Sequence, residues 1–281
     1  MTARLRVRKW DPSTIKDDRI VLFIGARGTG KSVMQMDIMK HMCSRVDFGV
    51  GMTPTMDTLT EWEKHIPPSW LFEGFNQEKL EDMIDAQRRS LRQGRQTRHL
   101  FLFLDDCVYD KKVLKSTAMR DVFLNGRHLK LHMSCAVQYL MDMGPDLRTN
   151  IDYVICMREK ILANRIKLHK YFFGMFERFE EFNKVFEKCT ENYCAMVMDN
   201  TVASSSRVED CVFWYRADPE DTPFKVGSRV FWKLSELHKK SKSAMRQDEE
   251  DAHQASAQAR QSGRGKSSRG LVVTMEGEED D

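Results

Sequence analysis

Eight residues near the start of the chain have the spacing of a phosphate-binding loop. The segment reads GARGTGKS and fits the Walker A pattern G-x-x-x-x-G-K-S. Gly25 and Gly30 permit a tight turn and a close approach of phosphate to the main chain. Lys31 supplies a positive charge for the β- and γ-phosphates, and Ser32 offers a hydroxyl to Mg²⁺. We therefore predict that ATP and Mg²⁺ bind through Gly25, Ala26, Arg27, Gly28, Thr29, Gly30, Lys31 and Ser32.

Two adjacent acids follow an apolar strand. Residues 99–104 read HLFLFL, and such an uninterrupted apolar run is typical of a parallel sheet covered on both faces. Asp105 and Asp106 then lie at the carboxyl edge of the sheet, where open α/β sheets bind ligands. We interpret Asp105 as the Walker B residue that holds Mg²⁺ through its water shell. Asp106 is the candidate to polarise the attacking water. Taken alone, the pair is better explained as the start of a loop or a cap of the next helix; the Walker A loop makes the catalytic interpretation the better one.

A glutamine ends another predicted strand. Residues 131–137 form an apolar run that leads into Gln138. Its amide can accept a hydrogen bond from water and donate one to a phosphate. We interpret Gln138 as a sensor of the γ-phosphate, although a glutamine facing solvent would look the same in sequence.

These residues must be positioned by an α/β domain. The predicted strands are 4–10, 21–24, 47–52, 99–104, 131–137, 153–157, 195–198 and 211–215, and the predicted helices follow residue 32 and lie within 60–91, 112–123, 161–173 and 176–189. The helix after the loop should use Val33, Met34, Ile38 and Met39 as its apolar face, and the helix within 60–91 should use Leu80, Met83, Ile84 and Leu91. The phenylalanines at helical spacing in 176–186 indicate packed core rather than a base-stacking platform.

Composition divides the chain into an N-terminal arm (1–16), an ATPase domain (17–235) and a charged tail (236–281). The tail carries a net charge of −2 and the remainder +5, a mild basic excess that is compatible with nucleic acid without indicating it. From Lys239 on, blocks of charge with few apolar residues predict disorder, serving either a docking tether or solubility. The GRGKS segment at 263–267 is not a second loop, because Arg260 replaces the first glycine.

The chain has no membrane or disulfide signature. No apolar run approaches the roughly 20 residues of a membrane span, and the N-terminus has no apolar signal segment, so we expect a soluble protein made in the cytosol, without membrane insertion. The seven cysteines include no C-x-x-C pair. We expect reduced thiols and no zinc site.

The order of these motifs resembles one family. Besides the loop, the acid pair and Gln138, the chain carries Asn125-Gly126-Arg127-His128, Arg148-x-Asn150-Ile151-Asp152-Tyr153, Trp10-Asp11-Pro12, Thr53-Pro54-Thr55 and Phe213-Trp214-Tyr215-Arg216-Ala217. Over roughly residues 8–216 it is similar to the DNA-packaging ATPases of nucleocytoplasmic large DNA viruses, the poxvirus-like branch of the HerA/FtsK superfamily of P-loop ATPases. Many of these relatives have glutamate where this chain has Asp106.

The resemblance implies a RecA-like P-loop NTPase fold in which the Gln138 strand lies between the Walker A and Walker B strands. It also implies a homo-oligomeric, hexamer-like ring that drives double-stranded DNA into a capsid by ATP hydrolysis. Each site would then need an arginine from the neighbouring subunit, either Arg127, which we favour, or Arg148. We expect location in the host cytoplasm at the virus factory, and in the virion, with a capsid or membrane-associated virion protein as a further partner.

Two other functions use the same loop. A P-loop kinase of a small metabolite would need an arginine-bearing lid and no acid pair with a strand-end glutamine. A scaffold that binds nucleotide to assemble, without turnover, would not need Asp106. We favour the DNA-translocating ATPase over both.

Overall fold

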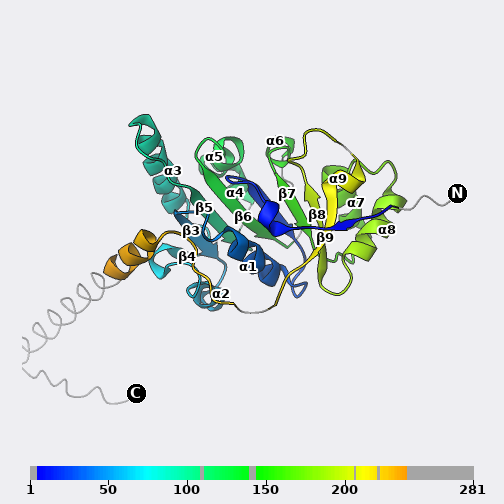
Figure 1. Cartoon of the computed structure of the whole chain (residues 1–281), viewed down its shortest axis with the longest axis horizontal. Coiled ribbons are helices and arrows are strands. Elements are labelled where there is room, and N and C mark those ends of the chain that lie inside the picture. The colour runs from blue at the N-terminus through cyan, green and yellow to red at the C-terminus, as the bar shows by residue number, and fades with distance from the viewer. Residues whose placement is uncertain (1–4, 108–110, 139–143, 206, 220–221, 239–281) are drawn as a thin grey trace, which may run out of the picture. The chain divides into compact units, whose positions relative to one another are not determined.

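Nine strands form one sheet in the order β1-β9-β8-β7-β2-β6-β5-β3-β4 (Figure 1). This computed structural model describes residues 5–107, 111–138, 144–205, 207–219 and 222–238. The chain divides into two units, residues 1–235 and 236–281, and the sheet belongs to the first. The predicted tail from Lys239 on lies outside the described residues.

The strands are β1 (Arg8–Lys9), β2 (Ile20–Ile24), β3 (Phe48–Thr53), β4 (Leu71–Glu73), β5 (Leu100–Asp105), β6 (Leu131–Val137), β7 (Tyr153–Cys156), β8 (Cys194–Asp199) and β9 (Val212–Arg216). The helices are α1 (Lys31–Met42), α2 (Met56–Trp62), α3 (Gln77–Arg92), α4 (Lys111–Lys115), α5 (Thr117–Asn125), α6 (Pro145–Arg148), α7 (Leu162–Phe172), α8 (Phe179–Cys189) and α9 (Val208–Cys211), with short 3-10 turns at Pro12–Thr14 and Pro68–Trp70.

The part of the sheet from β7 to β4 is parallel. β2 pairs with β6 on one side and β7 on the other, and β6 pairs in turn with β5. The Gln138 strand therefore lies between the Walker A and Walker B strands, as the family resemblance implied. β8 is antiparallel to both β7 and β9, and β1 adds a short parallel edge beside β9. Because β2, β5 and β6 are parallel, their carboxyl ends meet at one edge of the sheet.

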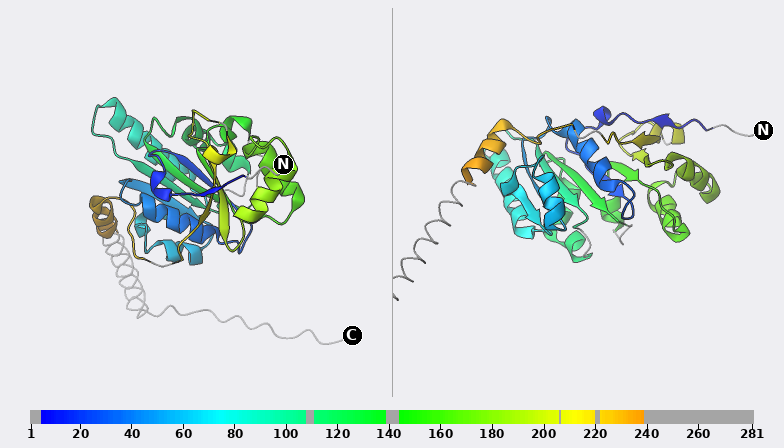
Figure 2. Two further views of the ribbon diagram at one scale, coloured as in Figure 1. Left: turned by 45° about the vertical axis from the view of Figure 1, so that its right-hand side comes forward. Right: turned by 90° about the horizontal axis from the view of Figure 1, so that it is seen from below.

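Helices cover both faces of the sheet (Figures 1 and 2). One core joins alternate strand residues such as Leu22 and Leu102 to α3, α5 and α8. The other joins the intervening residues, such as Phe23 and Phe103, to α1 and α2. The predicted fold class, a mostly parallel sheet with helices on both faces, is confirmed. The phenylalanine stripe is also core, since Phe182 is fully buried.

Several predicted elements are wrong in detail. The strand expected over 4–10 is only β1, and its two residues are exposed. The helix expected over 112–123 is two helices, because Ser116 caps α5 by accepting a hydrogen bond from the Met119 amide (3.3 Å). In the segment expected to be loop, Thr55 caps α2, and β4 then adds a three-residue edge strand. A strand of three residues is too short to show an alternating pattern.

Two residues assigned to apolar faces are exposed. Val33 is 49% exposed, whereas Met34, Ile38 and Met39 of α1 are buried. Neighbouring residues of a helix are rotated by about 100° about its axis. When Met34, Ile38 and Met39 face the sheet, Val33 therefore points away from it. Leu91 is 36% exposed in the last turn of α3.

The structure also bears on the cysteines and on the length of the helices. The seven cysteines are free thiols, and five of them are buried. Within the ranges given above, no helix combines the length and the apolar character that crossing a bilayer requires.

A buried histidine makes the fold sensitive to acid. His132 lies within β6 and is 1% exposed, and its Nδ1 has no hydrogen-bond partner among the described residues. Burial, together with nearby Arg45, lowers the pKa of His132 from 6.5 to about 4. The folded state therefore keeps the ring neutral while the unfolded chain binds a proton below pH 6.5. Stability from this residue is complete above pH 6.5 and is lost as the pH falls toward 4.

We expect the loss from His132 to reach about 2 kcal/mol at pH 5. Urea unfolding of the protein and of His132→Leu at pH 7 and pH 5 measures it. The variant should lose about 2 kcal/mol less than the wild type between the two pH values, because leucine binds no proton. Equal losses in both proteins would contradict a neutral buried ring.

Candidate functional site

The phosphate loop connects β2 to α1 at the carboxyl edge of the sheet. A Cβ on Gly25 would lie 2.8 Å from the Cβ of Met157, so only glycine fits where the loop leaves β2. The Gly25 amide donates to the Val137 carbonyl (3.1 Å), which ties the loop to β6. Gly30 caps α1 with φ at 86°, a left-handed conformation that glycine adopts at little cost. The residues Gly25 to Ser32 thus form one loop that ends on a helix N-terminus, the arrangement that binds phosphate.

Three predicted residues meet beside this loop. Lys31, which is buried, donates a hydrogen bond through Nζ to Oδ1 of Asp106. Gln138 donates through Nε2 to the other carboxylate oxygen of Asp106 (3.2 Å). Asp106 has φ at 48°, an uncommon conformation that aspartate tolerates better than most residues. Its carboxylate therefore joins the ends of β5 and β6 to the first residue of α1.

The two predicted metal ligands also meet. Asp105, the last residue of β5, is buried, and the Ser32 and Trp62 side chains lie near its carboxylate and favour its charged form. Burial, reinforced by the neighbouring Asp106 charge, raises the pKa of Asp105 to about 6. A bound cation would lower that pKa again. The hydroxyl and carboxylate oxygens are the hard ligands that Mg²⁺ prefers, so this pair fits the ion.

Sequence analysis missed two residues that position the site. Gln35 of α1 is fully buried and donates through Nε2 to the Ser134 hydroxyl (3.0 Å) and the Leu104 carbonyl (3.2 Å). It therefore fixes α1 against β5 and β6. The signal was its spacing, since Gln35 is one helical turn after Lys31. Trp62 is buried on α2 and packs against Phe103, with ring centroids 3.9 Å apart and ring planes tilted by 51°.

Arg127 lies away from the other predicted site residues. It precedes β6, at the amino edge of the parallel strands, and its guanidinium pairs with Asp152 (2.5 Å). Asp152 is 2% exposed and also accepts from the amide of Ile20, the first residue of β2 (3.0 Å). Arg127 itself is 58% exposed. Arg127 therefore does not reach the phosphate loop of its own subunit. This is what we expect of a residue that acts on the site of a neighbouring subunit.

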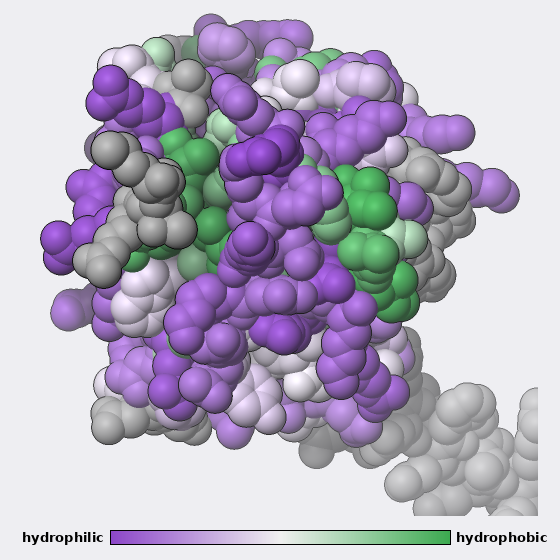
Figure 3. Space-filling view, turned by 90° about the vertical axis from the view of Figure 1, so that its right-hand side faces the viewer, coloured by the Kyte–Doolittle hydropathy of each residue, from purple (hydrophilic) through white to green (hydrophobic). Residues whose placement is uncertain are grey.

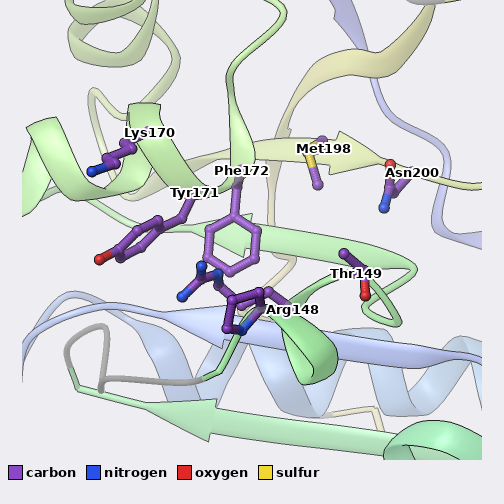
Figure 4. A pocket seen from close by; sticks show the side chains of 8 residues that line it. Arg148, Thr149, Lys170, Tyr171, Phe172, Met198 and Asn200 are labelled. Atoms are coloured by element: carbon purple, nitrogen blue, oxygen red, sulfur yellow. The ribbon is translucent and has the colours of Figure 1, made fainter.

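Arg148 lies at the same amino edge, at the end of α6. Its guanidinium carbon is 4.0 Å from the centre of the Tyr171 ring. Arg148 lines an open pocket of about 270 Å³, shown in Figure 4 with Thr149 and Asn200 on one side and Lys170 and Tyr171 on the other. Its cation-π contact holds the side chain on its own subunit.

The sheet order, the loop after β2 and the two acids at the carboxyl end of β5 define a RecA-like P-loop NTPase. The family model of the poxvirus A32 protein matches residues 10–240. The chain belongs to this family, and the resemblance noted from its motifs is confirmed.

Relatives and solved structures agree with this placement. Protein L437 of Acanthamoeba polyphaga mimivirus, described as uncharacterized, is 30% identical over 247 residues, which cover 84% of each chain. Protein 088R of invertebrate iridescent virus 3, also uncharacterized, is 30% identical and covers 74% of this chain and 80% of its own. The genome packaging NTPase B204 of Sulfolobus turreted icosahedral virus 2, in complex with ATP-gammaS, shares the fold with a TM-score of 0.51 at 16% identity, covering 72% of this chain and 98% of its own.

Proposed function

We propose that this protein is a Mg²⁺-dependent ATPase that translocates double-stranded viral DNA into the capsid during virion assembly. The observation that carries the proposal is the meeting of Lys31, Asp106 and Gln138 at the end of the phosphate loop, in a chain of the poxvirus A32 family. The shared fold with B204, whose structures carry ATP analogues, supports nucleotide binding. An ATPase of this kind would act in the host cytoplasm, at the virus factory, and in the virion.

The hydrogen bonds around Asp106 suggest how ATP would change the site. In the structure, Lys31 is paired with the Asp106 carboxylate. The γ-phosphate would compete for the same ammonium group, because it carries more negative charge. Losing Lys31 would release Asp106 to orient water, while the Gln138 amide remains within reach of both the carboxylate and the phosphate. Turnover would thus be coupled to occupation of the loop.

The metal would be held between Ser32 and Asp105. When bound, Mg²⁺ neutralises the charge that develops on the phosphates. In this chain, the Trp62 and Ser32 side chains lie near the Asp105 carboxylate and favour its charged form. Because the pKa of Asp105 is about 6, most of its carboxylate is ionised at neutral pH and carries the charge that attracts the cation.

The DNA partner would be bound through its backbone. A motor must pass every sequence, so its contacts should go to phosphates and be independent of the bases. The net charge of +5 outside residues 236–281 favours such contacts. We also propose a homo-oligomeric ring, in which each site would receive Arg127 or Arg148 from the next subunit, and a capsid or membrane-associated virion protein as the docking partner.

ATP hydrolysis by the purified protein tests the proposal, with and without long double-stranded DNA, at 50 and 150 mM salt. We expect DNA to stimulate turnover, and the DNA concentration needed for half of that effect to rise at least tenfold with the added salt, because released counterions drive phosphate binding. Lys31→Ala should be inactive under all conditions. Turnover that is indifferent to DNA would favour a small-metabolite kinase or an assembly ATPase. No turnover would favour a scaffold.

A further inference from the structure

The phosphate site leaves one direction open for the rest of the nucleotide. β2, which leads into the loop, has β6 on one side and β7 on the other. Lys31, Asp106 and Gln138 occupy the side of β6 and β5, where the terminal phosphate would lie. The ribose and base must therefore extend toward β7.

An open cavity of about 810 Å³ lies on that side of the loop. Three segments line it: loop residues 26–29, residues 158–161 after β7, and residues 190–194 between α8 and β8. Ligand pockets for small molecules span about 300 to 1,000 Å³, so the space suits a nucleoside. Its wall carries charges of both signs, with three cations (Arg27, Arg158 and Lys160) and two acids (Glu159 and Glu191).

One aromatic side chain of this cavity has no role in the core. Tyr193 is 72% exposed and lies in the turn between α8 and β8. Its Cδ1 is 3.6 Å from the position that a Cβ on Gly30 would occupy, so the ring lies against the last glycine of the phosphate loop. Packing does not explain this position, because the ring buries little of its surface.

The backbone beneath Tyr193 is held in an uncommon conformation. Tyr193 has φ at 60° and Asn192 has φ at 50°. Left-handed residues other than glycine cost free energy and persist where the surroundings hold them. Here the Cys194 amide donates to the Glu191 carbonyl (2.9 Å) and closes the turn. The turn keeps the exposed ring beside the loop.

An exposed apolar residue lines the same cavity. Ile161, which precedes α7, is 59% exposed. Figure 3 shows the end of the molecule that carries α7 and α8, where apolar patches interrupt a mostly hydrophilic surface. Together Tyr193 and Ile161 give the cavity the apolar surface that a flat heterocycle needs, next to the loop that binds its phosphates.

We propose that the base of the bound nucleotide occupies this cavity and stacks on the Tyr193 ring. This inference rests on the proposed binding of ATP and adds the residue that recognises the base. Base–aromatic stacking contributes a factor of about 5 to 100 in affinity. Because a purine offers a larger face than a pyrimidine, the site should prefer purine nucleoside triphosphates.

Titration calorimetry with Mg²⁺ tests this with two probes, ATP-γS and inorganic tripolyphosphate, which lacks a base. Tyr193→Ala should bind ATP-γS about 5- to 100-fold more weakly and tripolyphosphate within twofold of the wild type. Tyr193→Phe should behave as the wild type toward both. The matched control is Ile166→Ala, which removes an exposed apolar side chain of α7 that is not among the cavity residues.

The other outcomes separate the stacking role of Tyr193 from the proposed binding of ATP. If Tyr193→Ala binds ATP-γS as tightly as the wild type, the base lies elsewhere and the ATPase proposal stands. If the variant loses affinity for both probes equally, Tyr193 supports the loop and the stacking role is wrong. A wild-type protein that binds neither probe overturns both proposals. Loss of purine-over-pyrimidine preference in Tyr193→Ala would support the stacking role independently.

Discussion

Asp106→Asn should lower ATP turnover by a factor of about 10² to 10⁴, the usual contribution of a positioned general base. The substitution changes little else. An amide oxygen can still accept from Lys31, and asparagine tolerates the left-handed φ of 48° that this position requires. ATP affinity should stay constant or increase, because a negative charge that competes for Lys31 is removed. Single-turnover phosphate release and ATP-γS binding measure the two effects separately.

Asp105→Asn is the matched control for this prediction. It removes the neighbouring carboxylate, so it should weaken Mg²⁺-dependent nucleotide binding, whereas Asp106→Asn should spare binding and remove the chemical step. If Asp106→Asn keeps more than a tenth of the wild-type rate, another group activates the water. If both variants fail to bind nucleotide, the two acids act as one metal site and the division of roles proposed here is wrong.

The phosphate loop, the acid pair and Gln138 could be predicted from sequence because each lies within a short, contiguous segment. The loop is contiguous, and each of the other two predicted groups directly follows an apolar strand. Parallel strands bring their carboxyl ends to one edge, so Asp105, Asp106 and Gln138 had to approach the loop once the strand order was right. The strand order itself came from the family resemblance, since periodicity does not specify which strands pair.

The remainder of the site depends on contacts between distant segments. Gln35 and Trp62 look like ordinary helix residues, and only the packing of α1 and α2 on the sheet brings them beside Leu104 and Asp105. Tyr193 carries no motif, and its place beside Gly30 follows from the turn between α8 and β8. Short elements such as β4 and α6 were missed because three or four residues show no period.

The segment after β9 also depends on distant contacts. Phe231 lies within the predicted domain, is buried, and packs against Phe48 and Trp70 near the opposite end of the sheet from β9. Its hydrophobic partners are more than 150 residues earlier in the chain, so local sequence gave no sign of them.

Arg127→Ala should lower the ATPase rate of the assembled protein by a factor of about 10³ or more if the arginine completes the neighbour's site. The residue faces away from its own loop and is more than half exposed, which suits contact with a neighbour. Its ion pair with Asp152 complicates a single substitution, because Asp152 is buried and helps to anchor the start of β2. Arg127→Lys is the control: it keeps a positive charge near Asp152 but loses the planar fork that spans phosphate oxygens. Thermal unfolding should therefore be close to wild type in Arg127→Lys while its turnover is low.

Mixing two inactive variants separates the roles of this arginine. Arg127→Ala subunits keep an intact phosphate site, and Asp106→Asn subunits keep an intact arginine. In a head-to-tail ring, an Arg127→Ala subunit can lie next to an Asp106→Asn subunit. The boundary that joins the intact phosphate site of the former to the intact arginine of the latter then forms a complete active site. A mixture should therefore regain activity that neither protein has alone. If Arg127 only stabilises Asp152, Arg127→Ala protein that is folded would already be active and mixing would add nothing. The same mixture made with Arg148→Ala asks the question of the second arginine. Recovery with only one of the two arginine variants identifies the residue that crosses the subunit boundary, because an arginine acting within its own subunit cannot be supplied by another.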